Sequence, residues 1–298
     1  MKQPLVAVFT KNRINPAYVA ARSGADRTAQ RLGAVARHYV PQKPDDSDEQ
    51  ISLIHKALAD KVDAIVLTPA HATAVNGAVR AINAAGVPIF NIINRMTEGD
   101  AVCFVGSDDY GLAREVADYL CRHLGGRGGV AIVEGTASAV TNHARVRGFR
   151  DAIEKYNEIQ LLTTISGAFL RPVARTIAPQ LLALPARPDG IICANDDMAL
   201  GVIDVLKERG LAIPIVGVNA VPDAITAIKH GTLLATADFD AMKLASIATE
   251  AAVRHLRGER VPREILLPVQ IIDRANCAAW DKPIEARECP RWEDLATG

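Results

Sequence analysis

Polar and aromatic side chains follow nearly every apolar segment of this 298-residue chain. In open α/β sheets, ligands bind beyond the carboxyl ends of the strands, so these residues are candidates for one shared site. Planar Asn, Asp and Arg groups bridge neighbouring hydroxyls, and aromatic rings lie against C–H faces, which is the chemistry that holds a small polyhydroxylated molecule. The candidates, in chain order, are Asn15, Tyr18, Asn94, Arg95, Arg145, Phe169, Asn195, Asn219 and Phe239, with Asp196 and Asp238 beside them.

Motifs of known catalytic chemistry are missing from the sequence. It contains no G-x-x-x-x-G-K-[ST], H-E-x-x-H or G-x-S-x-G, so phosphate-loop, zinc-protease and hydrolase-elbow interpretations lose their main support. Gly126–Ala131 fits the loose pattern G-x-G-x-x-G/A, but a dinucleotide loop follows a strand, and this segment precedes one. We therefore expect a helix-to-strand turn there and no cofactor. His71 and His143 lack a Ser or Cys partner with a third orienting group, so we expect rim residues and no catalytic residue.

Helix starts explain several of the remaining polar residues. The pairs Asp108-Asp109 and Asp196-Asp197 stand at the starts of predicted helices, where a carboxylate caps free backbone N–H groups. Ser47 with Gln50 three residues later has the spacing of a capping box. We expect all of these to be capping residues.

The cysteines and the N-terminus bear on the compartment. The five cysteines contain no C-x-x-C pair and no metal-like spacing with the seven histidines, so we expect no metal site. Cys103 and Cys193 lie in strand-like segments and read as small buried hydrophobes. Cys277 and Cys289 could pair in an oxidising compartment, which the sequence leaves open. The apolar segment Leu5–Phe9 is shorter than a signal-peptide core of about 7 to 15 residues, so either the protein is cytoplasmic or a leader has been removed.

The composition excludes several classes of protein. Lys+Arg and Asp+Glu both number 34, and 49% of residues are hydrophobic with only 4% aromatic, which excludes disorder and a basic protein that coats nucleic acid. A chain of this length buries roughly 75% of its unfolded surface, enough for two aliphatic cores. No apolar segment approaches the roughly 18 to 20 residues that span a bilayer, so we expect a protein that is not membrane-embedded.

Short apolar segments alternate with segments of helical period along the chain. This alternation predicts parallel strands joined by crossover helices, and the lack of polar alternation within the strands predicts helices on both faces. The pattern restarts near residue 101, so the fold class is α/β with two Rossmann-like, doubly wound parallel-sheet lobes. The expected strands are 5–10, 34–40, 64–68, 88–92, 101–106, 129–134, 159–165, 190–194 and 214–218.

The order of these segments predicts two discontinuous lobes. The helix 241–257 should return to the first lobe, so several segments would cross between the lobes and form a hinge around a ligand cleft. The tail 278–298 carries Trp280 and Trp292, which suggests docking onto the second lobe. The expected N-terminal lobe is 1–107 with 240–270, and the expected C-terminal lobe is 108–239 with 271–298.

Several motifs stand along the chain in a characteristic order and spacing. They are Asn15-Pro16 with an aromatic residue two positions later, GVPIFNIINR, Gly106-Ser107-Asp108-Asp109, Arg145-x-x-Gly148-Phe149, CANDDMALG from Cys193 to Gly201 and IVGVNAVPDA from Ile215 to Ala224. With these motifs the chain resembles the periplasmic sugar-binding proteins of ABC importers, of the ribose and galactose type, over about residues 5–276.

This resemblance implies a periplasmic, non-enzymatic receptor that needs no cofactor. The first lobe would supply Asn15, Tyr18, Asn94 and Arg95; the second would supply Arg145, Phe169, Asn195 and Asn219, with Phe239 at the last crossing. Hinge closure would trap a small sugar or sugar derivative, and the closed receptor would dock on an ABC permease. We expect a monomer that binds no nucleic acid.

The sequence departs from the family at the site. Asn94 and Asn219 stand where Asp is common, and Phe239 stands where an amide is usual. Arg95 and Arg145 would then lack two acceptors, and a buried cation without an anion is costly. One hypothesis is an anionic ligand such as a sugar acid; the other is a neutral sugar or polyol, with Asp108, Asp196 or Asp238 balancing the charge.

Two interpretations from other classes stay open. The ligand-sensing domain of a LacI-type repressor has the same architecture, but such repressors usually carry a DNA-binding head of about 60 residues, and the first strand here begins at Leu5. An enzyme that acts on a sugar is the other rival, and turnover of a bound sugar would reveal it.

Overall fold

The computed structural model describes residues 3–283, 286–288 and 292–295. The chain divides into two compact units. The first unit comprises 1–107, 240–267 and 284–298, and the second comprises 108–239 and 268–283. The chain passes between the units after Ser107, Phe239, Leu267 and Pro283.

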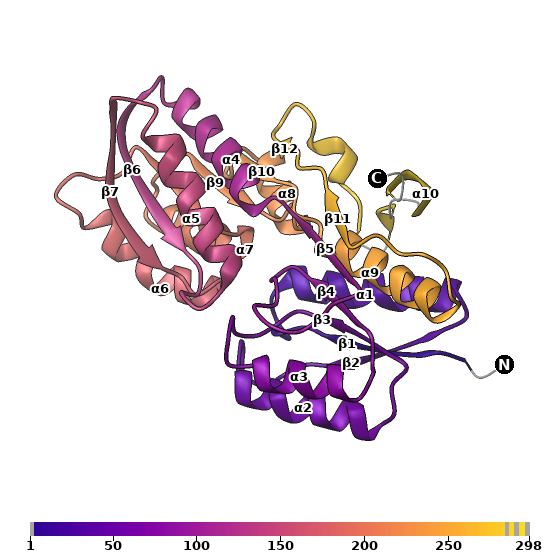
Figure 1. The fold of residues 1–298 in the computed structure, drawn as a ribbon. Coiled ribbons are helices and arrows are strands. Elements are labelled where there is room, and N and C mark those ends of the chain that lie inside the picture. The colour runs from indigo at the N-terminus through magenta and orange to yellow at the C-terminus, as the bar shows by residue number, and fades with distance from the viewer. Residues whose placement is uncertain (1–2, 284–285, 289–291, 296–298) are drawn as a thin grey trace. The chain divides into compact units, whose positions relative to one another are not determined.

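The first unit is built on a six-stranded parallel sheet with the order β11-β5-β4-β3-β1-β2. Helices α2 and α3 cover one face, and α1 and α9 cover the other (Figure 1). The strands are β1 (Leu5–Phe9), β2 (Val35–Tyr39), β3 (Ala64–Leu67), β4 (Ile89–Ile92), β5 (Cys103–Ser107) and β11 (Glu264–Leu267). The helices are α1 (Pro16–Arg31), α2 (Ser47–Ala59), α3 (Asn76–Ala84) and α9 (Ala241–Leu256).

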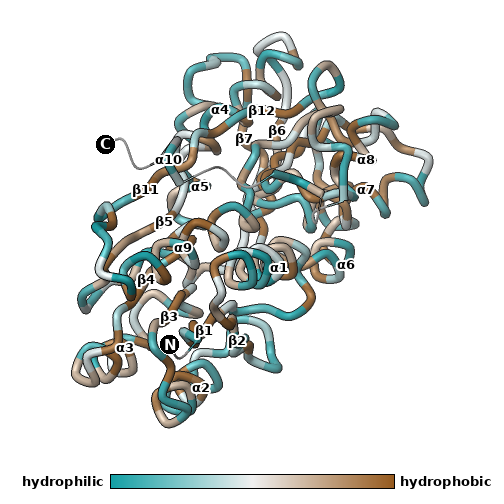
Figure 2. The backbone as a smooth tube through the Cα atoms, turned by 90° about the vertical axis from the view of Figure 1, so that its right-hand side faces the viewer, coloured by the Kyte–Doolittle hydropathy of each residue, from teal (hydrophilic) through white to brown (hydrophobic). Residues whose placement is uncertain are grey.

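Aliphatic side chains fill the layer between this sheet and α2 and α3. Ile54 of α2 and Ile82 of α3 are fully buried against Phe9, Ile65 and Leu67 of the strands. The apolar residues run continuously along β1 and β3, whereas they alternate with polar ones on the two helices (Figure 2). Continuous apolar strands are expected where helices cover both faces of a sheet.

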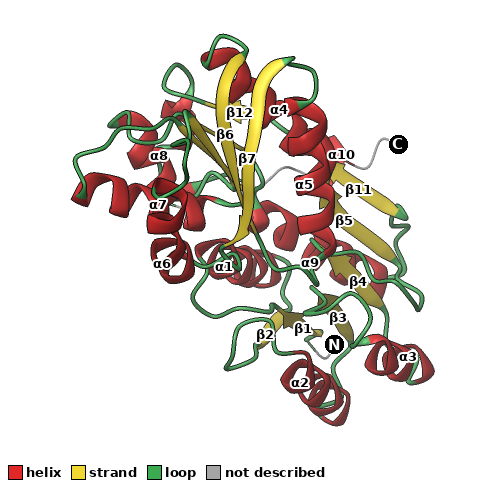
Figure 3. Cartoon of the chain, turned by 90° about the vertical axis from the view of Figure 1, so that its left-hand side faces the viewer, coloured by secondary structure: helices red, strands yellow, loops and turns green. Residues whose placement is uncertain are grey.

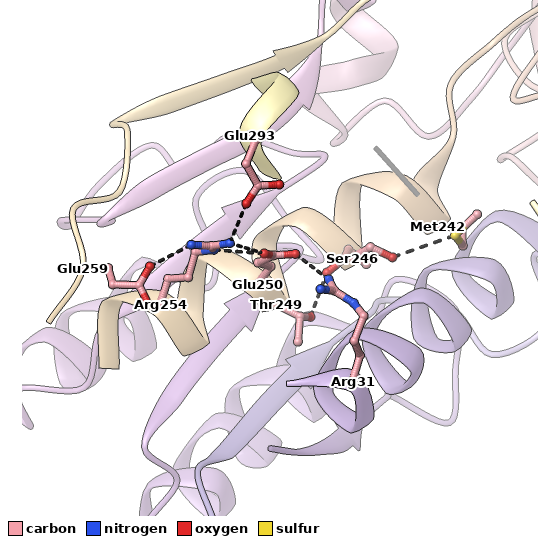
Figure 4. A network of polar contacts seen from close by, with 9 residues as sticks. Arg31, Met242, Ser246, Thr249, Glu250, Arg254, Glu259 and Glu293 are labelled. Atoms are coloured by element: carbon pink, nitrogen blue, oxygen red, sulfur yellow. Dashed lines mark hydrogen bonds and ion pairs between the residues drawn. The ribbon is translucent and has the colours of Figure 1, made fainter. Parts of the chain in front are cut away.

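On the other face, α1 and α9 approach unusually closely. A Cβ at Gly24 of α1 would lie 2.3 Å from the carbonyl oxygen of Met242, so only glycine fits there. Farther along, Glu250 of α9 is buried and accepts from Arg31 of α1 at 2.5 Å and from Arg254 (Figure 4). A buried carboxylate needs such partners, because its desolvation is otherwise uncompensated.

The tail divides between the units: residues 278–283 belong to the second, whereas the described residues 286–288 and 292–295 pack on the first. The ring of Trp292, at the start of α10 (Trp292–Leu295), lies 5.1 Å from the guanidinium carbon of Arg254, which also pairs with Glu293 at 3.2 Å. Arg27 donates to the carbonyl of Arg287. The expectation that the whole tail docks on the second lobe is therefore wrong for these residues, since Arg254 offers both a cation for the ring and a donor for the carboxylate.

Replacement of Trp292 by Ala should lower the free energy of unfolding by about 3 kcal/mol, because the side chain is 8% exposed and its loss leaves a cavity beside α9. Urea unfolding of the variant measures this. Trp280→Ala is the matched control, since Trp280 is only partly buried in the second unit. Equal losses in the two variants would contradict the packing role of Trp292.

The second unit repeats the arrangement with the order β12-β10-β9-β8-β6-β7, in which only β12 runs antiparallel. Helices α4 and α5 cover one face, and α6, α7 and α8 cover the other (Figure 3). The strands are β6 (Arg127–Glu134), β7 (Glu158–Ser166), β8 (Gly190–Cys193), β9 (Ile215–Val218), β10 (Ala235–Ala237) and β12 (Ile271–Ile272). The helices are α4 (Asp109–His123), α5 (Val140–Ile153), α6 (Arg171–Leu182), α7 (Asp196–Glu208), α8 (Pro222–Lys229) and the 3-10 turn Cys277–Trp280.

Two local expectations have clear outcomes. The capping box at Ser47 is wrong: Asp46 is the N-cap of α2, and Gln50 instead bonds to the carbonyl of Thr68 and the N–H of Ala70. The long amide side chain of Gln50 is buried against the sheet and bonds two backbone groups just beyond β3. The turn expected at Gly126–Ala131 is shorter than that segment: β6 already begins at Arg127, so only residues 124–126 connect α4 to β6, with positive φ at Gly125 and Gly126.

Candidate functional site

In the first unit, two buried asparagines lie just beyond the carboxyl ends of the strands. Asn15 caps α1, because its Oδ1 accepts from the N–H of Ala17 at 3.0 Å. Asn94 follows β4, and its Nδ2 donates to the carbonyl of Pro69 at 3.2 Å. Asn94 Oδ1 is buried and has no hydrogen-bond partner among the described residues. A buried acceptor without a hydrogen bond is costly, so Oδ1 of Asn94 is a candidate acceptor for a ligand donor.

A third asparagine, which the sequence analysis missed, holds Asn94 in place. Asn91 lies within β4, is 2% exposed and donates to the carbonyls of Leu67 and Asn94. Its Oδ1 accepts from the N–H of Met96. The sequence did contain a signal for Asn91, because it is the one polar residue in the apolar strand β4.

The side chain of Arg95, the residue after Asn94, contacts β5 and β11. Its guanidinium lies 3.7 Å from the ring centroid of Phe104 and pairs with Glu264, the first residue of β11. Tyr18, on the first turn of α1, is partly exposed. The side chain of Arg95 is therefore half-exposed beside β5 and β11, and the carboxylate of Glu264 balances its charge.

The second unit gathers its candidates around Arg145 of α5, which is 3% exposed. Its Nε donates to Oδ1 of Asp109 at 2.8 Å, and its Nη1 donates to the carbonyl of Ala194 at 2.6 Å. The ring of Phe239 lies 4.7 Å from the guanidinium carbon. A cation with a carboxylate, a carbonyl and a ring around it is held in one orientation.

Asp109, which the sequence analysis expected to cap a helix, is instead the ion-pair partner of Arg145. Asp108 alone caps α4, through a 2.9 Å bond from the N–H of Gly111. Burial raises the pKa of Asp109 above its ordinary value, and Arg145 opposes that rise. Asp109, which the neutral-ligand hypothesis did not consider, therefore forms the ion pair with Arg145, and Asp196 is a further charged neighbour of that guanidinium.

Phe169 and Asn195 are linked to each other beside this group. Asn195 caps α7 through a 2.9 Å bond from the N–H of Met198, and its Nδ2 donates to the carbonyl of Phe169 at 3.1 Å. Phe169 has a φ of 59°, and its ring covers Gly135, where a Cβ would lie 2.1 Å from the ring. The positions of the Phe169 ring and of the Asn195 carboxamide therefore depend on the left-handed backbone conformation at Phe169, after β7.

Asp196 is not a cap either. It is fully buried, and its oxygens accept from Oγ1 of Thr236 at 2.7 Å and from the N–H of Val221 at 3.1 Å. Burial raises its pKa to about 7, although these donors oppose the rise. Asp197 accepts from the N–H of Arg171. The sequence placed both residues correctly on the first turn of α7 but gave them the wrong partners.

The titration of Asp196 should be visible in the stability of the protein. The unfolded chain loses this proton near pH 4 and the folded chain near pH 7, so the contribution of this group to stability is present at low pH and is lost as pH rises through 7. Stability measured by urea unfolding should therefore fall from pH 5 to pH 8 in the wild type relative to Asp196→Asn. A difference that grows in the opposite direction would contradict the raised pKa.

The cysteines are consistent with buried hydrophobes. Cys103, Cys121, Cys193 and Cys277 are buried free thiols, and Cys289 lies outside the described residues. Burial raises the pKa of Cys121 to about 11 and that of Cys103 to about 12, so neither is a thiolate near neutral pH. Among the residues that the structure describes, no group of three or more His, Cys, Asp and Glu side chains could hold a metal ion. Within the same ranges, no helix has the length and apolar character to cross a membrane.

The two sheets and the residues at their carboxyl ends define a solute-binding architecture. The chain belongs to the periplasmic binding protein domain family, whose pattern matches residues 6–260. Its two parallel-sheet units have the fold of type I periplasmic binding proteins.

Several characterised proteins are similar over most of their length. A ribose import binding protein of Bacillus subtilis is 28% identical over 266 residues, which is 89% of this chain and 85% of that protein. A D-apiose import binding protein of Actinobacillus succinogenes is 29% identical over 285 residues, which is 93% of this chain and 91% of that protein. A periplasmic solute-binding protein of an ABC transporter from Actinobacillus succinogenes, solved with bound D-allose, is 27% identical with a TM-score of 0.87 over 92% of this chain and 99% of that one.

Proposed function

We propose that this protein is a periplasmic receptor that captures a small neutral sugar or polyol and delivers it to an ABC importer. The relatives named above are import binding proteins, which favours a transport receptor over the sensing domain of a repressor or an enzyme. Ribose, apiose and allose are neutral polyhydroxylated molecules. The receptor acts as a monomer outside the cytoplasm and meets a membrane permease as its partner.

The surroundings of Arg145 carry this proposal. A guanidinium that is neutralised by Asp109 and packed against Phe239 retains N–H groups for hydroxyl oxygens, while the ring offers an apolar surface to C–H groups. Asn94 and Asn219 each add a buried carbonyl oxygen that has no partner among the described residues and accepts from a hydroxyl. Ligand hydroxyls that both donate and accept fit this set.

The anionic hypothesis loses its premise. It assumed that Arg95 and Arg145 lack acceptors, but each is paired with a carboxylate, Glu264 and Asp109 respectively. A ligand carboxylate would compete with these internal anions. We therefore assign the ligand to the neutral class.

Capture requires that the ligand bind one conformation of the receptor more tightly than the other. We propose that residues of both units contact the ligand and that the crossings after Ser107, Phe239 and Leu267 act as the hinge. Affinity in the micromolar range corresponds to about 8 kcal/mol, which several hydrogen bonds and one or two rings supply.

Titration calorimetry tests the function with D-ribose, D-allose, xylitol and myo-inositol as probes. We expect saturable one-site binding of at least one of them, and NMR of the recovered probe should show it chemically unchanged. Turnover of the probe, or no binding by any of them, would overturn the proposal.

A further inference from the structure

The buried carboxylate of Asp196 joins three elements of the second unit. It belongs to α7, receives the hydroxyl hydrogen of Thr236 on β10 and receives the N–H of Val221 in the segment after β9. The approach is close, since a Cβ at Gly217 would lie 2.2 Å from Oδ1 of Asp196. Glycine at 217 is therefore required for the carboxylate to reach this place.

The segment that Asp196 holds is strained. Asn219 has a φ of 125° and Ala220 a φ of 52°, which non-glycine residues rarely adopt. Such a backbone persists only where its surroundings hold it. The N–H of Asn219 donates to the carbonyl of Ala237 at 2.9 Å, and the N–H of Val221 donates to Asp196.

This backbone places the side chain of Asn219 at the carboxyl end of β9. The side chain is 7% exposed, and its Oδ1 is buried without a hydrogen-bond partner among the described residues. An acceptor in that state is ready for a donor from outside the chain. Capping does not explain Asp196, because Asn195 already caps α7.

We propose that Asp196 is a positioning residue for ligand binding, which holds residues 219–221 so that the carboxamide of Asn219 faces the ligand. This inference rests on the proposed function, because Asn219 must meet a sugar hydroxyl. The charged and titratable neighbours of Asp196 are Arg145 of α5 and the Cys193 thiol of β8.

The test compares Asp196→Asn with Asp197→Asn, which changes the neighbouring carboxylate in the same way but leaves residues 219–221 untouched. At pH 8, calorimetry with the best sugar of the panel should show affinity weakened by about tenfold or more for Asp196→Asn and unchanged for Asp197→Asn. Thr236→Val keeps the volume but removes both the donor to the carboxylate and the Oγ1 that accepts from the N–H of Ala220 at 3.4 Å, so it tests the cluster of Thr236, Asp196 and residues 219–221 if Asp196→Asn does not fold.

A double-mutant cycle separates positioning from a general loss of stability. If Asp196 acts through Asn219, the double variant Asp196→Asn/Asn219→Ala should bind no more weakly than Asn219→Ala alone. Losses that simply multiply, or wild-type affinity in Asp196→Asn, would overturn the inference.

A measurement without ligand keeps the two proposals apart. In the free protein, the NMR chemical shifts of the backbone amides of Asn219 and Ala220 should change in Asp196→Asn and Thr236→Val, because these residues leave positive φ. The same chemical shifts should remain unchanged in Asp197→Asn. If the wild type binds no sugar, the proposed function fails, but these shifts still report on the segment. Unchanged shifts reject the positioning role whatever the sugar result.

Discussion

Replacement of Arg145 by Met should weaken sugar binding strongly and destabilise the protein, whereas Arg147→Met on the same helix should change neither property. Arg145 is buried and oriented by Asp109 and by the carbonyl of Ala194, so its removal takes away the N–H donors that we propose for the ligand hydroxyls. Truncating one partner of a buried, hydrogen-bonded charge pair costs about 2 kcal/mol or more, so we expect binding to weaken by about 30-fold or more. Arg147 is exposed and lies 4.7 Å from the ring of Tyr110.

The loss of stability has a separate cause. Asp109 is 9% exposed in the intact protein, and a buried carboxylate that has lost its cation costs about 3 to 5 kcal/mol. The double variant Arg145→Met/Asp109→Asn should recover most of the stability but none of the binding. Urea unfolding and calorimetry on the four proteins check both statements. Sugar binding by Arg145→Met at wild-type affinity would place the ligand elsewhere.

A neutral sugar should bind at least about tenfold more tightly than its sugar acid, because a ligand carboxylate near Arg145 also meets the buried carboxylates Asp109 and Asp196. Like charges at short range in a partly buried site repel by energies of this order. Parallel titrations with D-ribose and D-ribonate at one ionic strength measure the ratio.

Glu264→Gln provides the control for Arg95. It frees the guanidinium that Glu264 pairs with, and that guanidinium also stacks on Phe104. If Arg95 lies outside the ligand site, this change should leave both affinities as they are. Tighter binding of the acid than of the neutral sugar in the wild type would restore the anionic hypothesis.

The arrangement of strands was largely predictable because hydrophobic burial is a periodic, local property. Four-residue strands such as β3 and β9 are wholly buried, and their apolar runs stand out in the sequence. The short strands β10, β11 and β12 were missed. β11 and β12 lie at sheet edges and β10 has only three residues, so their pairing comes from neighbours distant in the chain.

The candidate site was predictable in composition but not in its contacts. A polar residue after a buried strand lies at the carboxyl end of the sheet, so the positions of Asn94, Asn195 and Asn219 followed from the sequence. Their roles did not, because the positive φ of Asn219 depends on surroundings that no local pattern reveals.

By itself the sequence determined the fold class, the repeat of strands and helices, and which residue types stand where strands end, because each of these depends on neighbours within a few positions. Only the tertiary structure decided that Arg145 is neutralised by Asp109, that Asp196 holds the segment after β9, and that Trp292 packs on Arg254. A buried charge pairs with a group that is near in space, because desolvation makes an unpaired charge costly. Arg145 and Asp109 are 36 positions apart in the sequence, so no local pattern predicts their pairing.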